Sequence, residues 1–198
     1  MNKRQNWLPF FLALLAGGMM HSSGAYSQEI DSGIEEFFDS CAGSWDVVLK
    51  NWGTDDTTKP DSWSGTATCS RFGESWLVSE MTLKNGVKSR WTLGYSGRDK
   101  TFSGVSIVNF SPHMKHQTGT YQSKTKTLSL LTKDKDVISG EKTEGKIELK
   151  IVDKTERVVL MFSKDKTTGA FSRSCEIVYK RRIKKGDKEV EGEKANPK

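Results

Sequence analysis

Polar and apolar side chains alternate along most of this chain, and this alternation is the main structural signal in the sequence. Trp45, Val47 and Leu49 share one face of an extended segment, and Asp46 and Lys50 occupy the other. A period of two is typical of a strand with one buried and one solvated face. Ten such segments follow one another: residues 45–52, 63–72, 75–83, 88–95, 101–109, 116–121, 127–132, 146–153, 157–163 and 170–181. The pattern therefore predicts an all-β chain.

Short turns join most of the predicted strands, which favours antiparallel pairing between neighbours in sequence. The dipeptide Asn85-Gly86 is the strongest of these hairpin signals. About ten antiparallel strands must close or double over to protect their edges. We therefore predict a single antiparallel meander β-barrel of about ten strands, and a two-layer sandwich is the second choice. Residues 31–40 carry Ile34, Phe37 and Phe38 at helical spacing and predict one short N-terminal helix.

The two ends of the chain differ from the body. Residues 1–27 have a basic start, an apolar run from Trp7 to Met20 and small residues at Ala25 and Ser27, which is the order of a signal peptide. We expect cleavage before Gln28 and an exported protein, periplasmic or secreted, with no membrane-spanning segment after cleavage. Residues 183–198 are charged and aromatic-free, which predicts a disordered basic tail. The expected domain is then the barrel at residues 28–182.

The basic charge of the whole chain is misleading as a guide to partners. The formal net charge of the 198 residues is +6. Cleavage would remove Lys3 and Arg4 and leave +4, and residues 180–198 alone carry +4. The body of the predicted barrel is therefore neutral. Because basic surfaces recognise nucleic acid through its phosphates, a neutral body and an exported location argue against a nucleic-acid partner. The sequence leaves the oligomeric state open.

Several motifs resemble known families. The tripeptide Gly43-Ser44-Trp45 at the start of the first strand resembles the lipocalin and wider calycin pattern, in which a basic residue of the last strand packs over the Trp. Arg181 or Arg182 would take that part here. More of the chain resembles a bacterial family known as domain of unknown function fifteen-seventy-nine. Its features span residues 37–182 and comprise Gly43-Ser44-Trp45, Gly65, Arg71-Phe72, residues 76–80, Gly94-Tyr95, Phe102, residues 119–121 and residues 176–181. Ser96 and the cysteines depart from that pattern. The resemblance implies a lipocalin-like barrel in an exported protein and implies no activity.

A small-ligand site inside the barrel is the leading functional hypothesis. By alternation, the inward faces would carry an apolar wall with one acid and one base, because Glu80 shares a face with Trp76, and Arg173 shares a face with Phe171. Barrels of this size can hold one small ligand. The predicted ligand-binding residues are Trp45, Trp76, Glu80, Arg90, Arg173 and Tyr179. We expect a small apolar or amphipathic ligand, bound without catalysis and without a cofactor, and Arg90 or Arg173 would suit a carboxylate or phosphate head group.

Two other functions compete with ligand binding. The first is a calycin-like enzyme that uses Glu80 or a histidine as acid or base, although no nucleophile or phosphate-loop motif occurs. The second is a structural, envelope-associated barrel whose interior is filled. For Glu80 the more ordinary interpretation is an ion pair with Arg90, Arg71 or Arg173, because a buried carboxylate needs a partner. The pair His113 and His116 could offer metal ligands, or haem could bind through one of them, but exposed loop histidines are favoured and no metal site is predicted.

Barrel closure makes specific predictions about position. If the first and last strands pair, Arg181 lies beside Trp45 on the inner face and Cys175 lies opposite Asn51. Trp52 then faces outward. In the first hairpin we expect Cys69 opposite Trp45, with Cys41 just beyond. A disulfide between Cys41 and Cys69 with a free Cys175 is the favoured pairing in an oxidising compartment, although simple buried thiols fit the sequence as well.

Overall fold

The computed structural model describes residues 31–53, 59–135 and 140–182. The predicted signal peptide and the predicted tail lie outside the described residues. One helix and ten strands follow one another along the described chain. They are α1 (Ser32–Cys41), β1 (Gly43–Asn51), β2 (Asp61–Phe72), β3 (Trp76–Leu83), β4 (Lys88–Ser96), β5 (Thr101–Val108), β6 (Lys115–Gln122), β7 (Thr127–Lys135), β8 (Lys142–Ile151), β9 (Glu156–Lys164) and β10 (Phe171–Arg181).

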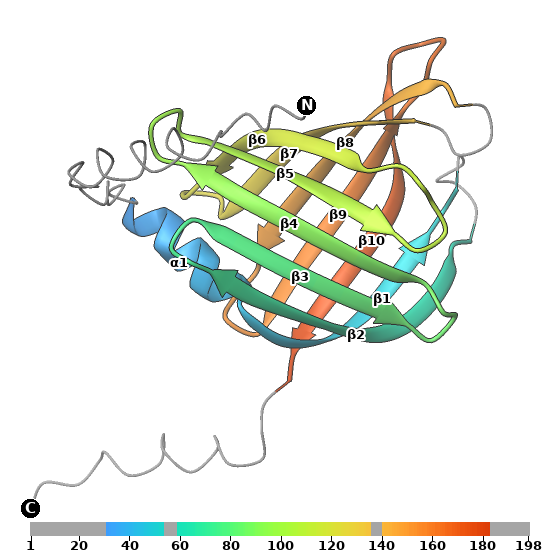
Figure 1. The fold of residues 1–198 in the computed structure, drawn as a ribbon. Coiled ribbons are helices and arrows are strands. Elements are labelled where there is room, and N and C mark those ends of the chain that lie inside the picture. Colours follow the sequence, from blue (N-terminus) through green and yellow to red (C-terminus); the bar gives the residue numbers. More distant parts are fainter. Residues whose placement is uncertain (1–30, 54–58, 136–139, 183–198) are drawn as a thin grey trace, which may run out of the picture.

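The ten strands form one closed antiparallel barrel (Figure 1). Each strand pairs with the next in sequence, and β1 pairs with β10 to complete the ring. At that seam Trp45 lies opposite Arg181 and Asn51 lies opposite Cys175. These pairings confirm the predicted fold class and the predicted closure. Closure leaves the described strands with no free sheet edge for another chain to extend.

The helix α1 covers one end of the barrel (Figure 1). It begins where the side chain of Asp31 accepts a hydrogen bond from the Gly33 amide at 2.7 Å, an N-cap that satisfies a free helical donor. Its apolar stripe faces the barrel and is buried: Ile34, Phe37, Phe38 and Cys41. The Phe37 ring lies 5.4 Å from the Phe102 ring and 4.8 Å from the Tyr121 ring. Burial of this stripe, rather than intrinsic propensity, stabilises a helix this short.

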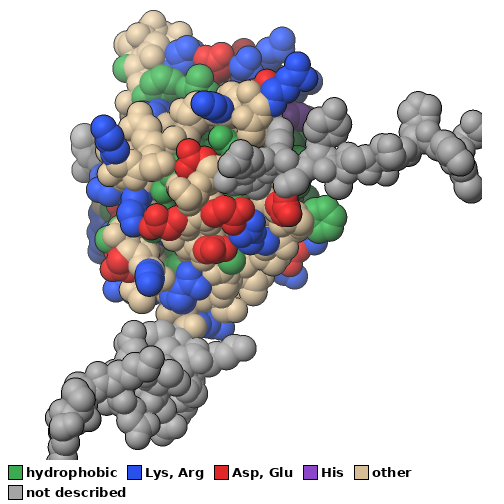
Figure 2. Space-filling view, turned by 90° about the vertical axis from the view of Figure 1, so that its left-hand side faces the viewer, with side chains coloured by type: hydrophobic (Ala, Val, Ile, Leu, Met, Phe, Trp, Pro, Cys, Tyr) green, Lys and Arg blue, Asp and Glu red, His purple; other side chains and the backbone are tan. Residues whose placement is uncertain are grey.

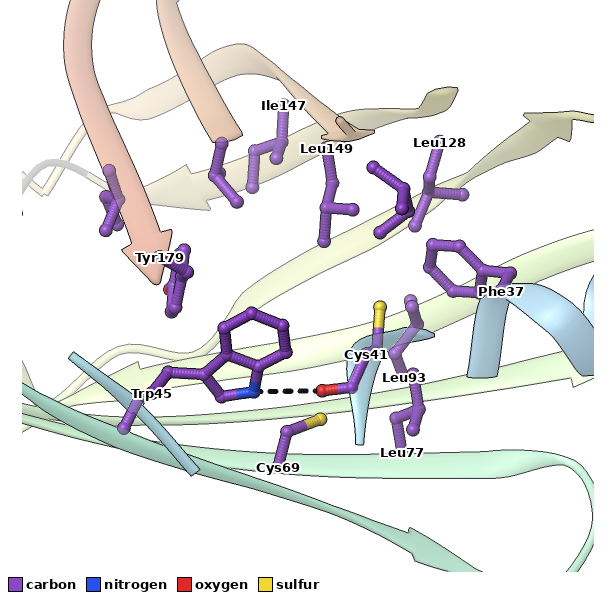
Figure 3. Packing of buried hydrophobic residues seen from close by; sticks show 14 of the residues in the cluster. Phe37, Cys41, Trp45, Cys69, Leu77, Leu93, Leu128, Ile147, Leu149 and Tyr179 are labelled. Carbon is purple, nitrogen blue, oxygen red and sulfur yellow. Dashed lines mark hydrogen bonds between the residues drawn. The ribbon is translucent and has the colours of Figure 1, made fainter. Parts of the chain in front are cut away.

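The interior has two halves, which we call the closed half, at the α1 end, and the open half, at the opposite end. The closed half is filled by large side chains from the strands and the helix, as Figure 3 shows. Its fully buried members include Phe37, Phe38, Trp45, Leu93, Phe102, Leu128 and Leu149. This packing places the hydrophobic core against α1 and leaves the opposite half to be considered separately.

The predicted inward face of β3 is wrong. Leu77, Ser79 and Met81 point into the barrel and are 4%, 9% and 8% exposed. Trp76 and Glu80 therefore lie on the outer face of the strand, since successive side chains alternate. The ring of Trp76 covers Gly94 of β4, where an added Cβ would lie 2.6 Å from the ring. A glycine on the neighbouring strand thus accommodates the large side chain outside the barrel.

A bulge changes which side chains face inward at the start of β10. The register shifts between Arg173 and Cys175, so Arg173 and Phe171 face outward although Cys175 and Tyr179 face inward as expected. A bulge adds one residue to a strand and reverses the alternation beyond it. The predicted inward position of Arg173 is therefore wrong.

The register of the first hairpin differs from the prediction by two residues. Cys69 lies opposite Gly43 rather than Trp45. A shift of two residues keeps the side chains on the same face, so Cys69 still points into the barrel. In the structure Cys41, Cys69 and Cys175 are all free thiols, and the favoured disulfide is not formed.

Candidate functional site

The open half of the interior retains accessible surface. Leu49, Trp63, Trp91, Met161 and Cys175 point inward from five strands, yet all are only partly buried. Most inward positions in the closed half are buried, although Tyr95 and Tyr121 there are also only partly buried. Inward-facing side chains of the open half therefore keep surface that solvent can reach.

A hydrogen-bonded polar network lies in the wall of the open half. The indole Nε1 of Trp91 donates to Oε1 of Gln117, and Nε2 of Gln117 donates to Oγ of Ser106 at 3.0 Å. Gln117 is only 2% exposed, and these bonds satisfy a buried amide that would otherwise be costly. The network fixes the Trp91 ring in the wall.

An ion pair stands at the rim of the open half. Lys115 Nζ lies 3.3 Å from Asp134 Oδ2, and the side chains are 47% and 13% exposed. Both residues are in phase with inward neighbours on their strands, Gln117 on β6 and Thr132 on β7. The rim therefore carries one positive and one negative charge next to each other.

The closed half contains a buried cation that the sequence analysis missed. The guanidinium of Arg157, which is 3% exposed, lies between two rings, with Cζ 4.4 Å from the centroids of both Trp45 and Tyr179. Its Nη1 donates to the Cys41 carbonyl at 2.9 Å, and its Nε has no hydrogen-bond partner among the described residues. Stacking on aromatic faces is the geometry of cation–π attraction.

The carbonyl of Cys41 at the end of α1 stabilises this cation. Arg157 Nη1 and Trp45 Nε1 both donate to the Cys41 carbonyl. Arg181 donates from Nη1 to Ala42 at 2.7 Å and from Nη2 to Ser40 at 2.9 Å. The last carbonyls of a helix lack internal partners and form the negative end of its dipole. Two guanidinium groups and one indole therefore cap α1 and hold it on the barrel.

Gly43 and Arg181 complete this cap. Gly43 has a φ of +134°, and a Cβ there would lie 2.5 Å from Nη1 of Arg181. Glycine is thus needed both for the backbone turn and for the approach of the guanidinium. Arg181 also lies with Cζ 4.5 Å from the Trp45 ring on the inner face, as the closure predicts.

Burial makes the ionisable side chains around Arg157 poorly reactive. Desolvation raises the pKa of Cys41 to about 11 and that of Tyr179 to about 12, and it raises the pKa of Cys69 as well. In the open half, desolvation raises the pKa of Cys175 to about 12. A thiol reacts as its thiolate, so these cysteines do not have the properties of catalytic nucleophiles.

Charged side chains also hold α1 from outside. Arg71 bonds to Glu35 at 2.8 Å and to Asp39 at 3.0 Å, and Lys126 bonds to Glu36 at 2.9 Å. Figure 2 shows acidic side chains gathered with basic ones on this face. The hydrogen bond from Arg71 holds the pKa of Glu35 below its usual value. The arrangement fastens the helix as a fixed cover.

The structure does not bring the predicted ligand-binding residues together. Trp45 and Tyr179 meet in the closed half, with ring centroids 6.4 Å apart. Glu80 and Arg90 form an ion pair, as the ordinary interpretation expects, but on the outer face, where their side chains are 53% and 59% exposed. Arg173 is also outside.

Arg173 packs against neighbouring residues on the outer face, and the two histidines lie in the β5–β6 connection and on β6. Arg173 stacks on Trp52, with Cζ 4.2 Å from the ring centroid, and lies 3.7 Å from Glu176. His113 is in the β5–β6 connection and His116 is exposed on β6. Among the residues described here, no group of three or more His, Cys, Asp or Glu side chains is placed to hold a metal ion.

A hollow on the outer rim carries little binding chemistry. It lies between the start of β8 and the β9–β10 connection and is lined by Lys142, Thr143, Glu144 and residues 164–169. Lys164 bonds Glu144 at 2.8 Å, and Lys166 bonds Glu141. Lys164 and Lys166 of this hollow are therefore engaged with carboxylates.

The closed meander, the terminal helix and the Trp45–Arg181 contact define a lipocalin-like barrel. The model of a family described as "Protein of unknown function (DUF1579)" matches residues 32–181, and the chain belongs to that family. No curated protein matches the sequence. No helix among the described residues has the length and apolar character needed to span a membrane.

Two solved structures share the fold at low sequence identity. Rv2717c from M. tuberculosis has a TM-score of 0.54 and 12% identity, over 78% of this chain and 100% of that one. The S-type phycobiliprotein lyase CPES from Guillardia theta has a TM-score of 0.50 and 10% identity, over 80% of this chain and 96% of that one. At these identities the likeness concerns the fold alone.

Proposed function

We propose that this protein is an exported, non-catalytic barrel that binds a small apolar or amphipathic molecule in its open half. One observation carries the proposal: inward-facing Leu49, Trp63, Trp91 and Met161 remain partly accessible, whereas the closed half is filled. A concave, largely apolar space with a few placed polar groups is the usual form of a small-molecule site.

The positions of Glu80 and His116 support binding rather than turnover. Glu80 is paired with Arg90 on the outer wall, and His116 is exposed on the outside of β6. Neither group lies in the interior, where a bound molecule would be held. A general acid or base must reach the proton it transfers.

The binding test uses N-phenyl-1-naphthylamine, an uncharged probe whose fluorescence rises in apolar surroundings. Met161→Trp would fill the open half, and Phe162→Trp is the matched control, because Phe162 is the next residue on β9 and faces outward. We expect saturable binding that Met161→Trp weakens at least tenfold and Phe162→Trp leaves unchanged. Circular dichroism establishes that both variants are folded. Absence of saturable binding, or an equal effect of both variants, would remove the proposal.

Export rests on the order of residues 1–27 and has its own test. The basic, apolar and small-residue segments match the substrates of signal peptidase. N-terminal sequencing of the protein from its native host should begin at Gln28, in an extracytoplasmic fraction. A mature chain that starts at Met1 would contradict export.

A further inference from the structure

We infer that the ligand of the open half is an uncharged molecule with its hydrogen-bonding groups along one edge, such as a hydroxylated ring system, and not an anion with a head and a tail. The inference rests on the proposed function and specifies its ligand. It follows from how polar and apolar side chains are divided between the walls of the open half.

One wall is polar over adjacent strands. Gln117 of β6 lies opposite Thr132 of β7, Thr132 lies opposite Gly145 of β8, and Gly145 lies opposite Ser163 of β9. This row crosses four consecutive strands. Nearer the rim is a second row of inward side chains, Ser106, Lys115, Asp134 and Thr143. We call these two rows the polar wall.

The facing wall is polar at its rim, at Asn51 of β1 and Asp61 of β2, and apolar below the rim. Cys175 of β10, Leu49 of β1 and Trp63 of β2 point inward there, and Met81 and Leu83 of β3 continue the surface. A molecule between the two walls would meet hydrogen-bonding groups on one side and hydrocarbon on the other. The polar and apolar side chains are thus separated across the width of the barrel. A molecule with a polar head and an apolar tail would instead require them to be separated along the barrel axis.

Several hydroxyl groups of the polar wall have unused hydrogen-bonding capacity within the described residues. Ser106 accepts a bond from Gln117, but its own hydroxyl proton has no partner among the described residues. The hydroxyl groups of Thr132 and Thr143 likewise make no side-chain hydrogen bond within the described parts of the chain. Because partly buried polar groups favour paired states, these hydroxyls suit a ligand that both donates and accepts.

Among the residues that the structure describes, the open half has no free positive charge that would hold an anionic head group. The inward cation among the described residues of this half is Lys115, which Asp134 neutralises at 3.3 Å. An anion would have to displace this carboxylate and leave it without its partner. Arg173, which would suit such a head group, stacks on Trp52 outside the barrel.

The buried Arg157 is out of reach from the open half. The next inward residues of its own strand and the two flanking strands are Val159, Ile177 and Leu149, and these are 5%, 2% and 1% exposed. This layer separates the guanidinium from the open half. Arg157 therefore serves the end of α1 and not a ligand.

The test compares three ligands built on one ring system at pH 6.5: 2,3-dihydroxynaphthalene, with both hydroxyls on one edge, naphthalene, with none, and 2-naphthoate, an anion. Each competes with N-phenyl-1-naphthylamine. We expect the dihydroxy compound to bind at least tenfold more tightly than either of the others. Tightest binding of 2-naphthoate or of naphthalene would overturn the inference and leave the proposed function standing. If neither the probe nor any of the three binds, the proposed function itself fails.

Two variants locate the effect on the polar wall. Thr132→Val removes one hydroxyl with little change of shape and should weaken 2,3-dihydroxynaphthalene about fivefold, the range of one hydrogen bond, without weakening naphthalene. Thr118→Val, on the outer face of β6, is the matched control and should change neither. Asp134→Asn frees Lys115 and should strengthen 2-naphthoate several-fold. Equal effects of Thr132→Val and Thr118→Val, or no gain from Asp134→Asn, would contradict the assignment.

Discussion

Removal of the Trp45 side chain should destabilise this barrel more than removal of any other Trp side chain. Trp45 is 0% exposed, and its ring lies against the guanidinium groups of Arg157 and Arg181. Its Nε1 donates to the Cys41 carbonyl at 3.2 Å. The one side chain thus connects β1 to β9, β10 and the end of α1.

The magnitude follows from these contacts. An aromatic side chain of this kind buries about 150–250 Å², which at about 25 cal/mol per Å² is worth about 4–6 kcal/mol. Core Trp→Ala substitutions cost about 3–5 kcal/mol, and each cation–π contact adds about 0.5–2 kcal/mol. Because these terms overlap, we expect Trp45→Ala to lower the free energy of unfolding by about 5 kcal/mol. Domains are stable by only about 5–15 kcal/mol, so the variant should be near its unfolding limit.

The assay is a urea titration followed by far-ultraviolet circular dichroism, which does not depend on the removed indole. Trp52→Ala is the matched control, because Trp52 is half-buried on the outside under Arg173 and should cost about 1 kcal/mol. Trp45→Phe keeps a ring but loses the indole hydrogen bond, and it should fall between the two. Equal losses for Trp45→Ala and Trp52→Ala would refute the assignment of faces on β1.

Three further predictions concern a surface contact, an ion pair and a thiol. Gly94→Ala should lower the urea midpoint of unfolding, because the added Cβ would lie 2.6 Å from the Trp76 ring. This loss of stability should vanish in a Trp76→Ala background. A loss that persists in that background would mean that the ring is not the cause. The Arg71 hydrogen bond lowers the pKa of Glu35 from 4.5. The contribution of ionised Glu35 to the stability of the fold is therefore complete above pH 4.5, and it is lost as the pH falls through the depressed folded-state pKa. The difference in Tm between wild type and Glu35→Gln should therefore be constant above about pH 5 and shrink below 4.5, and a difference that grows on acidification would contradict the sign. Burial raises the pKa of Cys175 to about 12, so its alkylation by iodoacetamide in the folded protein should rise about tenfold per pH unit between pH 8 and 10, with no plateau near pH 9.

Sequence patterning was sufficient for the barrel and for its seam. Alternation around Trp45 and around Tyr179 gave the inner faces of the first and last strands, and pairing them placed Arg181 over Trp45. Both inner faces are clear because large apolar side chains occupy them, whereas the outer faces carry charged side chains together with Val48 and Val178. Register in such strands is strongly specified when only one face is apolar.

The candidate site was harder to predict, for physical reasons. Both faces of β3 carry large apolar residues, and only the partner Gly94 shows that Trp76 lies outside. The reversal at Arg173 comes from a bulge, which alternation within one strand does not reveal. Arg157 is in phase with Val159 and Met161, and this phase could have identified it as an inward-facing residue. The sequence alone argues against that position, because a lone arginine is ordinarily a surface residue unless helix carbonyls and aromatic rings are available to it.

The closing seam has a consequence for how the chain folds. The bond from Arg181 to the Ala42 carbonyl joins residues 139 positions apart, and the first strand finds its second neighbour only when the last strand is in place. Pairing across such a separation is slow because loop-closure entropy is lost before the contact forms. Until then β1 and β9 each present an unpaired edge, which is a template for association with other chains. A chain truncated before β10 would therefore not form a smaller barrel, but an open sheet prone to aggregation.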